Sequence, residues 1–204
     1  MTGIILIVIG LLISGAGILI ISKSSKAQPA IAHQNVETIP LDSVKVSSAD
    51  ESDIYRKAGL DFEKYVVLKF NEKYFSIKNW AGDKYVEGRY AETTTQPDLQ
   101  LELKQKGQVY PLAVECKWRN KPNSDFVRFA NDDQLKRYKA FEETGKIPTF
   151  IVLGVGGTPS APEVVYVIPV KRFNKPIQHL ENLEPFKRGS DGNFFFDREK
   201  RVLM

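Results

Sequence analysis

Two carboxylates and one ammonium group stand out in the stretch PDLQLELKQKGQVYPLAVECKWR, residues 97–119. Asp98 directly follows a proline, while Glu115 and Lys117 are separated by one residue in an otherwise apolar run. Side chains two positions apart on a strand share a face, so Glu115 and Lys117 point the same way if this run is a strand. Ionised groups on a half-buried sheet face are costly, and a hard divalent cation bound by oxygen atoms is a natural compensation for the acids. The stretch therefore predicts a metal site with an ammonium group beside it.

The residues around these charges predict a β-hairpin that positions them. Residues 98–104 alternate strictly between polar and apolar, residues 109–118 form a returning strand, and Lys106 with Gly107 is a turn signal. Such a hairpin places the acid of the first strand, Asp98, near the acid of the second strand. On its own, the E-x-K pattern is more often a surface salt bridge, so the surrounding pattern has to decide.

The remaining elements predict a mixed β-sheet flanked by helices, an α/β fold. A helix over residues 50–70 begins with acids and has apolar residues at helical spacing. A second helix, over residues 131–146, begins with acids and ends at Gly145. Residues 82–96 predict an irregular connection, and the tail after residue 170 shows no pattern. Further strands are predicted at residues 74–80, 149–155 and 163–170.

Four short motifs occur in a fixed order along the chain. They are G-x-x-F-E-x-x-V at residues 59–66, P-D at 97–98, E-x-K at 115–117 and Q-x-x-x-Y at 134–138. In this order they resemble the PD-(D/E)xK nuclease superfamily, whose fold is restriction-endonuclease-like. The resemblance covers roughly residues 54–170 and implies a phosphodiester hydrolase that uses Mg²⁺ or Mn²⁺.

The resemblance also implies a role for each matched residue near the metal. Asp98 and Glu115 would bind the cation, and Cys116 would add its main-chain carbonyl. Glu63 would bind the metal directly or through water. Lys117 would position and help to deprotonate the attacking water, or stabilise charge at phosphorus. Hydrolysis of a phosphodiester needs a metal for these purposes, so the chemistry and the residue types agree.

Further residues are expected to support the site or to hold nucleic acid. By the resemblance, Gln134 and Tyr138 would support the active site or contact the nucleic-acid backbone. A basic rim continues from the expected active strand into the next helix and suits a phosphate backbone, although a solvated charged face is an alternative. Its expected members are Arg119, Lys121, Arg128, Lys136 and Arg137.

The N-terminal part predicts a membrane anchor. Residues 3–21 are apolar and uncharged, and as a helix they would span roughly 28 Å, close to the thickness of a bilayer core. Lys23 and Lys26 follow this run, so the positive-inside rule predicts a cytoplasmic C-terminal body. Residues 22–49 predict a flexible tether, and residues 50–204 the nuclease-like domain. A cleaved signal peptide is the alternative, and would make the protein secreted or periplasmic.

Other classes of chemistry find little support in the sequence. His33 lies in the tether and His179 in the tail, so no zinc site or Ser-His triad is expected near the acids. The lone cysteine, Cys116, rules out an intramolecular disulfide and fits a reducing compartment. Residues 154–160, GVGGTPS, lack the G-K-[ST] ending of a phosphate loop. The net charge of +4 permits a polyanionic partner without requiring one.

The sequence therefore predicts a membrane-anchored, Mg²⁺-dependent endonuclease or exonuclease, with DNA as the expected substrate. The alternative is a catalytically inactive nuclease-like domain that binds nucleic acid or protein at the membrane, although the intact Asp98, Glu115 and Lys117 count against it. Gly10 and Ser14, four residues apart in the apolar run, are compatible with a homodimer packed through that segment.

Overall fold

The computed structural model describes residues 48–81, 85–86, 89–90, 96–189 and 191–204. All of them belong to one unit, Lys45–Met204. The predicted membrane segment, residues 3–21, lies outside the described residues, as does nearly all of the predicted tether. Within the described ranges, none of the helices combines the length and hydropathy that crossing a bilayer requires.

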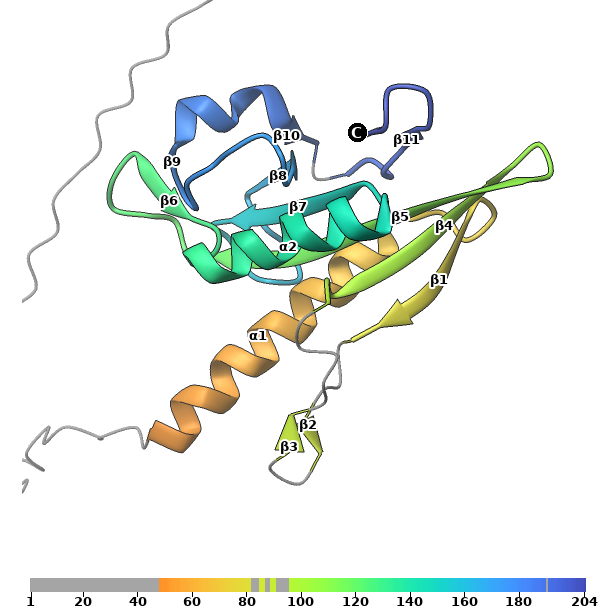
Figure 1. Ribbon diagram of the computed structural model, residues 1–204. Helices are drawn as coiled ribbons and strands as arrows, with labels where there is room; N and C mark the ends of the chain where they lie inside the picture. Colours follow the sequence, from red (N-terminus) through yellow and green to blue (C-terminus); the bar gives the residue numbers. More distant parts are fainter. Residues whose placement is uncertain (1–47, 82–84, 87–88, 91–95, 190) are drawn as a thin grey trace, which may run out of the picture. The chain divides into compact units, whose positions relative to one another are not determined.

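Six strands form one mixed β-sheet in the order β1-β4-β5-β7-β8-β10 (Figure 1). The strands are β1 (Phe75–Trp80), β4 (Leu99–Gln105), β5 (Gln108–Arg119), β7 (Thr149–Val155), β8 (Val164–Pro169) and β10 (Lys187–Arg188). Neighbouring strands are antiparallel except β5 and β7, which are parallel. Parallel neighbours need a crossover connection, and the helix α2 (Asp132–Gly145) lies in it. The predicted mixed sheet is confirmed.

The hairpin of β4 and β5 has the register that the sequence predicts. Leu99 lies opposite Val114, and Gln105 opposite Gln108. The two residues between the strands, Lys106 and Gly107, have φ angles of 52° and 74°. Positive φ at both positions is typical of a type I′ turn, whose twist matches that of the flanking strands. The turn therefore fixes which residues of the two strands face each other.

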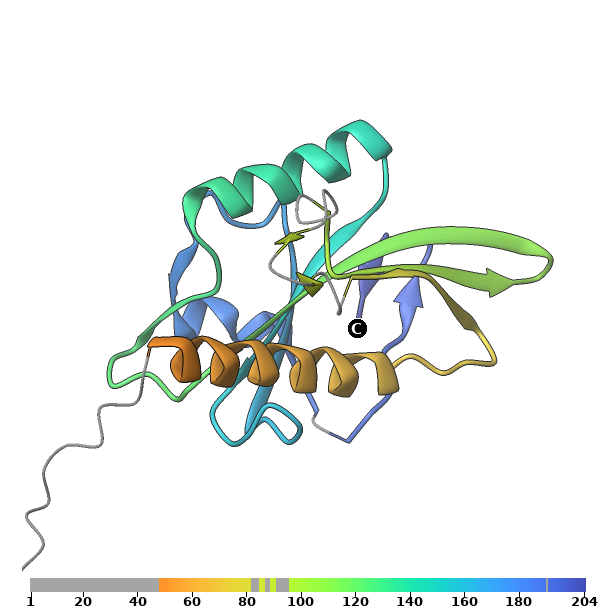
Figure 2. The same ribbon diagram turned by 90° about the horizontal axis from the view of Figure 1, so that it is seen from below.

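The helices cover opposite faces of the sheet, as Figure 2 shows for α1 (Ser48–Leu68) and α2. Phe62 and Val66 of α1 are buried in a first apolar cluster, which also contains the leucines of β4. Leu135 of α2 is buried in a second apolar cluster on the other face. Successive residues of β7 alternate between the clusters, with Phe150 in the first and Ile151 in the second. All residues of β7 are buried, as expected for a central strand.

The helix α2 is fixed at both ends. At its start the Oδ1 of Asn131 accepts a hydrogen bond from the Gln134 N–H (2.7 Å), and the Gln134 Oε1 accepts one from the Asn131 N–H (3.0 Å). This reciprocal pair is a capping box. The helix ends at Gly145 as predicted, and the residue after it, Lys146, is left-handed with φ of 53°. Arg201 donates to the Lys146 carbonyl (2.7 Å), which holds this turn through a contact that the local pattern does not contain.

The tail after residue 170, for which the sequence predicted no secondary structure, contributes buried side chains to both apolar clusters. Phe194, Phe196 and Leu203 are buried in the first cluster, and Leu183 in the second. The elements of the tail are β9 (Ile177–His179), a 3₁₀ helix η2 (Leu180–Phe186), β10, β11 (Phe196–Asp197) and β12 (Val202–Leu203). Strands of two or three residues are too short to display a period, which explains why the pattern was not visible.

Two short ribbons were also not predicted. The strand β6 (Phe126–Arg128) pairs antiparallel with β9, which joins the loop after β5 to the tail. The strands β2 (Tyr85–Val86) and β3 (Arg89–Tyr90) pair with each other in the segment predicted to be irregular.

The packing of α1 against the sheet requires a glycine at position 154 of β7, and we expect Gly154→Ala to be destabilising. A Cβ at Gly154 of β7 would lie 2.5 Å from Cε2 and 2.9 Å from Cζ of Phe62. The displaced ring should lower the free energy of unfolding by about 1–3 kcal/mol, as measured by urea denaturation. Gly189→Ala is the control, since a Cβ there meets nothing within 4 Å. Equal stability of Gly154→Ala and wild type would contradict this packing.

Candidate active site

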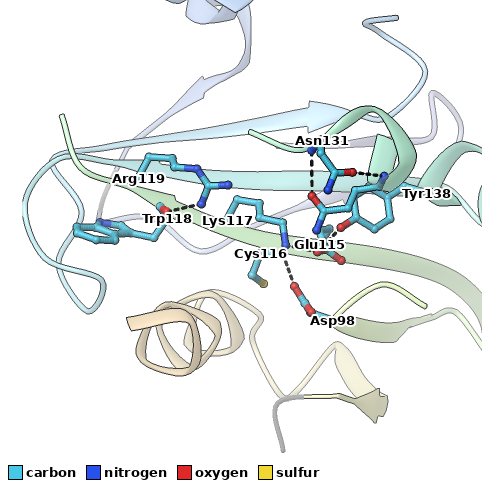
Figure 3. A network of polar contacts seen from close by, with 9 residues as sticks. Asp98, Glu115, Cys116, Lys117, Trp118, Arg119, Asn131 and Tyr138 are labelled. Carbon is cyan, nitrogen blue, oxygen red and sulfur yellow. Dashed lines mark hydrogen bonds and ion pairs between the residues drawn. The ribbon is translucent and has the colours of Figure 1, made fainter. Parts of the chain in front are cut away.

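Asp98, Glu115 and Lys117 meet where β4 begins and β5 passes it (Figure 3). The Nζ of Lys117 forms an ion pair with Oε1 of Glu115. The Oδ2 of Asp98 accepts a hydrogen bond from the N–H of Cys116 (2.8 Å), the residue between the other two. The structure thus brings together the acid after the proline and both charged residues of E-x-K.

The β4–β5 ladder stops at the proline of the P-D pair, and a side chain bonds the main chain of β5 beyond that point. The β4–β5 ladder ends with Leu99 opposite Val114, and continuing this register by two residues would place Pro97 opposite Cys116. Proline has no N–H, so in such a pair the Cys116 carbonyl would lack a ladder donor. The Asp98 carboxylate takes the place of a neighbouring backbone on the Cys116 N–H. The Cys116 main chain therefore faces a carboxylate instead of a continuing strand.

Glu115 is a buried acid held by two donors. It is only 3% exposed, and its Oε1 accepts a hydrogen bond of 2.5 Å from the hydroxyl of Tyr138 as well as the Lys117 contact. Burial raises the pKa of Glu115, the negative charge of Asp98 raises it further, and Lys117 and Tyr138 oppose this rise. The carboxylate is therefore desolvated, and its charge depends on its neighbours.

Lys117 carries the positive charge of the cluster. Its side chain is 17% exposed. Burial opposes the charged form, but the nearby carboxylates of Glu115 and Asp98 outweigh burial and raise the pKa of Lys117 above its ordinary value. The ammonium form is thus favoured at neutral pH, one positive charge beside two acids.

A hollow of about 440 Å³ opens beside these residues and contains Asp98 and Lys117 in its wall. Glu63 of α1 lines the same hollow, so the structure places the predicted helix acid at the site. The indole N–H of Trp80 donates to Oε2 of Glu63 (2.9 Å). Sequence reasoning missed Trp80, because nothing local links the end of β1 to a helix acid seventeen residues earlier.

The side chains of three other predicted site residues have three different environments. Gln134 uses its side chain in the capping box of α2. Tyr138 is 4% exposed, so its hydroxyl serves Glu115 rather than a surface. Cys116 turns its side chain into the first apolar cluster, where burial raises the pKa of the thiol, and it offers only its main chain to the site.

The predicted basic rim is spread over several elements. Arg119 lines the hollow, and its guanidinium donates to the carbonyls of Arg128 (2.9 Å) and Trp118 (2.8 Å), which fixes its position. The side chains of Lys121 and Lys136 are exposed in ion pairs with acids. Arg128 and Arg137 are exposed. Of the predicted rim, Arg119 is therefore the member in the wall of the hollow.

The oxygen atoms at this site suit a hard cation that takes only a few of its ligands from the protein. Across the described part of the chain, no three His, Cys, Asp or Glu residues are grouped so as to hold a metal ion. Mg²⁺ is usually held by one or two carboxylates, with water and substrate phosphates as its other ligands. Asp98 and Glu115 supply two carboxylates, and Pro97 leaves the Cys116 carbonyl without a ladder donor.

Comparisons with known proteins give a distant likeness. No protein-family model matches the sequence, and no curated protein matches it either. Among solved structures, the Holliday junction resolvase Hjc of the archaeal hyperthermophile Archaeoglobus fulgidus is similar to this chain with a TM-score of 0.42 and 15% identity. The match covers 62% of this chain and 89% of the resolvase chain. Functional interpretation therefore depends on the residues of the site.

The contact between Tyr138 and Glu115 predicts a loss of stability in Tyr138→Phe. A hydrogen bond to a buried carboxylate is worth about 1–3 kcal/mol, so the free energy of unfolding at pH 7 should fall by that amount in urea denaturation. Tyr166→Phe is the matched control, because Tyr166 is a tyrosine of β8 that is buried in the same second cluster. If both variants lose the same stability, the Tyr138 hydroxyl does not support Glu115.

Proposed function

We propose that this protein is a metal-dependent nuclease of the PD-(D/E)xK type, which hydrolyses phosphodiester bonds in DNA. One observation carries the proposal: the Asp98 carboxylate is bonded to the Cys116 N–H directly beside the Glu115–Lys117 pair. The mixed sheet and the order of the motifs along it support the same interpretation.

Asp98, Glu115 and the Cys116 carbonyl are the groups that would hold Mg²⁺ or Mn²⁺, with Glu63 as a further ligand directly or through water. A cation bound there supplies a polarised phosphoryl oxygen and a more acidic water molecule. Carboxylate and carbonyl oxygens are the ligand types that such hard cations prefer.

The chain's own groups supply the rest of the chemistry. Lys117 places an ammonium charge in the wall of the hollow, where it can stabilise negative charge that develops on a phosphate. Tyr138 fixes the Glu115 carboxylate from the opposite helix. Trp80 orients Glu63 through its indole N–H. Each acid is thus held in place before any substrate arrives, which lowers the cost of ordering the site.

The roles of the three charged residues predict different losses on substitution. Asp98→Asn and Glu115→Gln should weaken Mn²⁺ binding in calorimetry and reduce cleavage of a panel of labelled nucleic acids at least about 100-fold, because a carboxamide lacks the charge that a hard cation requires. Lys117→Ala should reduce cleavage similarly but keep Mn²⁺ binding, since an ammonium is not a ligand.

A matched control for these variants is Glu102→Gln. Glu102 is a partly exposed acid of β4 that pairs with Lys78, and it should affect neither metal binding nor cleavage. The inactive nucleic-acid binder would replace the nuclease if wild type bound the oligonucleotides and cut none of them with Mg²⁺ or Mn²⁺. Unchanged cleavage by the three variants would refute the assigned roles.

We further propose that residues 3–21 anchor this nuclease in the cell membrane, with the C-terminal domain in the cytoplasm. The apolar run and the lysines that follow it, Lys23 and Lys26, support this topology. In cells that express the full chain with a C-terminal tag, external protease should remove the tag only after the membrane is permeabilised. A tag digested on intact cells, or released into the medium, would contradict the orientation.

A further inference from the structure

The hollow beside Asp98 and Lys117 has a wall that the proposed hydrolysis does not use. It consists of one face of α1, where Tyr55, Ala58 and Gly59 line the hollow before Glu63 is reached. Residues four apart on a helix lie on the same face, so Tyr55, Gly59 and Glu63 form one continuous stripe. The stripe leads from an aromatic ring at its outer end to the acids at its inner end.

The packing of the described residues does not require a glycine at position 59. It lies in the middle of a 21-residue helix, where glycine is a poor helix former compared with alanine. A Cβ built on Gly59 would meet nothing within 4 Å, so no neighbouring group requires the missing side chain. Glycine at such a position allows a group from outside the chain to approach the backbone closely. The open space in front of Gly59 is part of the hollow.

Two aromatic side chains border this space. The Tyr55 side chain is on α1, and this residue is 71% exposed although its ring is large. Trp118 follows Lys117 on β5 and lines the hollow, and its indole N–H donates to the Gly156 carbonyl (3.1 Å), which fixes the ring. Aromatic rings beside a backbone-binding groove bind nucleic-acid bases by stacking, with little regard for sequence.

The charges of the hollow suit a nucleotide in one orientation. Lys117 and Arg119 provide positive charge on the β5 side and Asp98 and Glu63 provide negative charge, whereas the wall formed by Ala58 and Gly59 is uncharged. A phosphate is attracted to the β5 side, and the flat face of a base suits the uncharged wall and its aromatic border. The volume of about 440 Å³ is in the range of sites that hold one small ligand rather than a larger assembly.

We infer that this hollow is a subsite for one unpaired nucleotide adjacent to the scissile phosphate. Its base lies against Tyr55 and Trp118, and its backbone passes over Gly59. Bases inside an uninterrupted duplex are stacked on both faces and cannot offer a face to a ring. The inference rests on the proposed function and narrows its substrate class to single-stranded or locally unpaired nucleic acid, such as a flap, a gap or a splayed end.

Binding without metal tests the subsite separately from cleavage. With the full-length chain in EDTA, fluorescence anisotropy would compare a labelled 12-nucleotide oligothymidylate with a 12-base-pair duplex. Tyr55→Ala should weaken binding of the single strand at least about fivefold and leave duplex binding unchanged. Ile54→Ala is the matched control, because Ile54 is the adjacent residue, is also exposed, and does not line the hollow.

Substitutions of Gly59 test the open space directly. Gly59→Leu should fill the hollow and weaken binding of the single strand about tenfold or more, while Gly59→Ala should change it less than about twofold. Both should melt at or above the temperature of wild type, because both residues form helices better than glycine. A loss of affinity in Gly59→Leu without a loss of stability therefore reports a blocked site.

Tryptophan emission gives a signal from the subsite itself. The chain has two tryptophans, so Trp80→Phe leaves Trp118 as the only reporter, and Trp118→Phe leaves Trp80. The oligothymidylate should quench the emission of Trp118 at saturation and change that of Trp80 much less. The inference is overturned if Trp118 is not quenched, or if Tyr55→Ala and Gly59→Leu bind the single strand as wild type does.

The outcomes also separate the subsite from the proposed nuclease. If the single strand binds with the expected dependence on Tyr55 and Gly59 but nothing is cut with Mg²⁺ or Mn²⁺, the subsite stands and the proposed function fails. If wild type cuts duplex and single strand equally well, and both variants do the same, the nuclease stands and the subsite fails.

Discussion

The constraint on which the site depends is the end of the β4–β5 ladder at Pro97. The ladder stops before Pro97, whose missing N–H could not donate to the Cys116 carbonyl, and the N–H of Cys116 donates to the Asp98 side chain. This hydrogen bond from the main chain to a side chain joins Asp98 to the strand that contains Glu115 and Lys117. Asp98 is also held through its main-chain carbonyl, which accepts a hydrogen bond from the Ala81 N–H (2.8 Å).

The cost of burying Glu115 is offset by donors from two elements of the fold. An acid that is 3% exposed needs donors, and it obtains one from its own strand, Lys117, and one from α2, Tyr138. The crossover between the parallel strands β5 and β7 contains α2, and the capping box fixes where that helix begins. The helix α1 covers the other face and provides a wall of the hollow, so the layers that form the core also enclose the site.

Much of this arrangement could be predicted from the sequence, because its signals are local. Alternation and the Lys106–Gly107 turn predicted the hairpin, and the spacing of two residues predicted that Glu115 and Lys117 share a face. The use of Gln134 in a cap is also local, since its partner Asn131 is three residues away, but that residue was assigned to the site by the resemblance. The Trp80–Glu63 bond and the buried phenylalanines of the tail could not be predicted in this way. Each depends on contacts between segments far apart in the sequence, or on strands too short to show a period.

The location of a bound cation tests the central claim most directly. Crystals of the full-length chain grown with Mn²⁺ would show the ion by its anomalous scattering. The account predicts a peak bound by carboxylate oxygens of Asp98 and Glu115 and by the Cys116 carbonyl, at distances of about 2.0–2.3 Å. A saturating Mn²⁺ concentration that gives no peak there, with Lys117 still paired to Glu115, would contradict it.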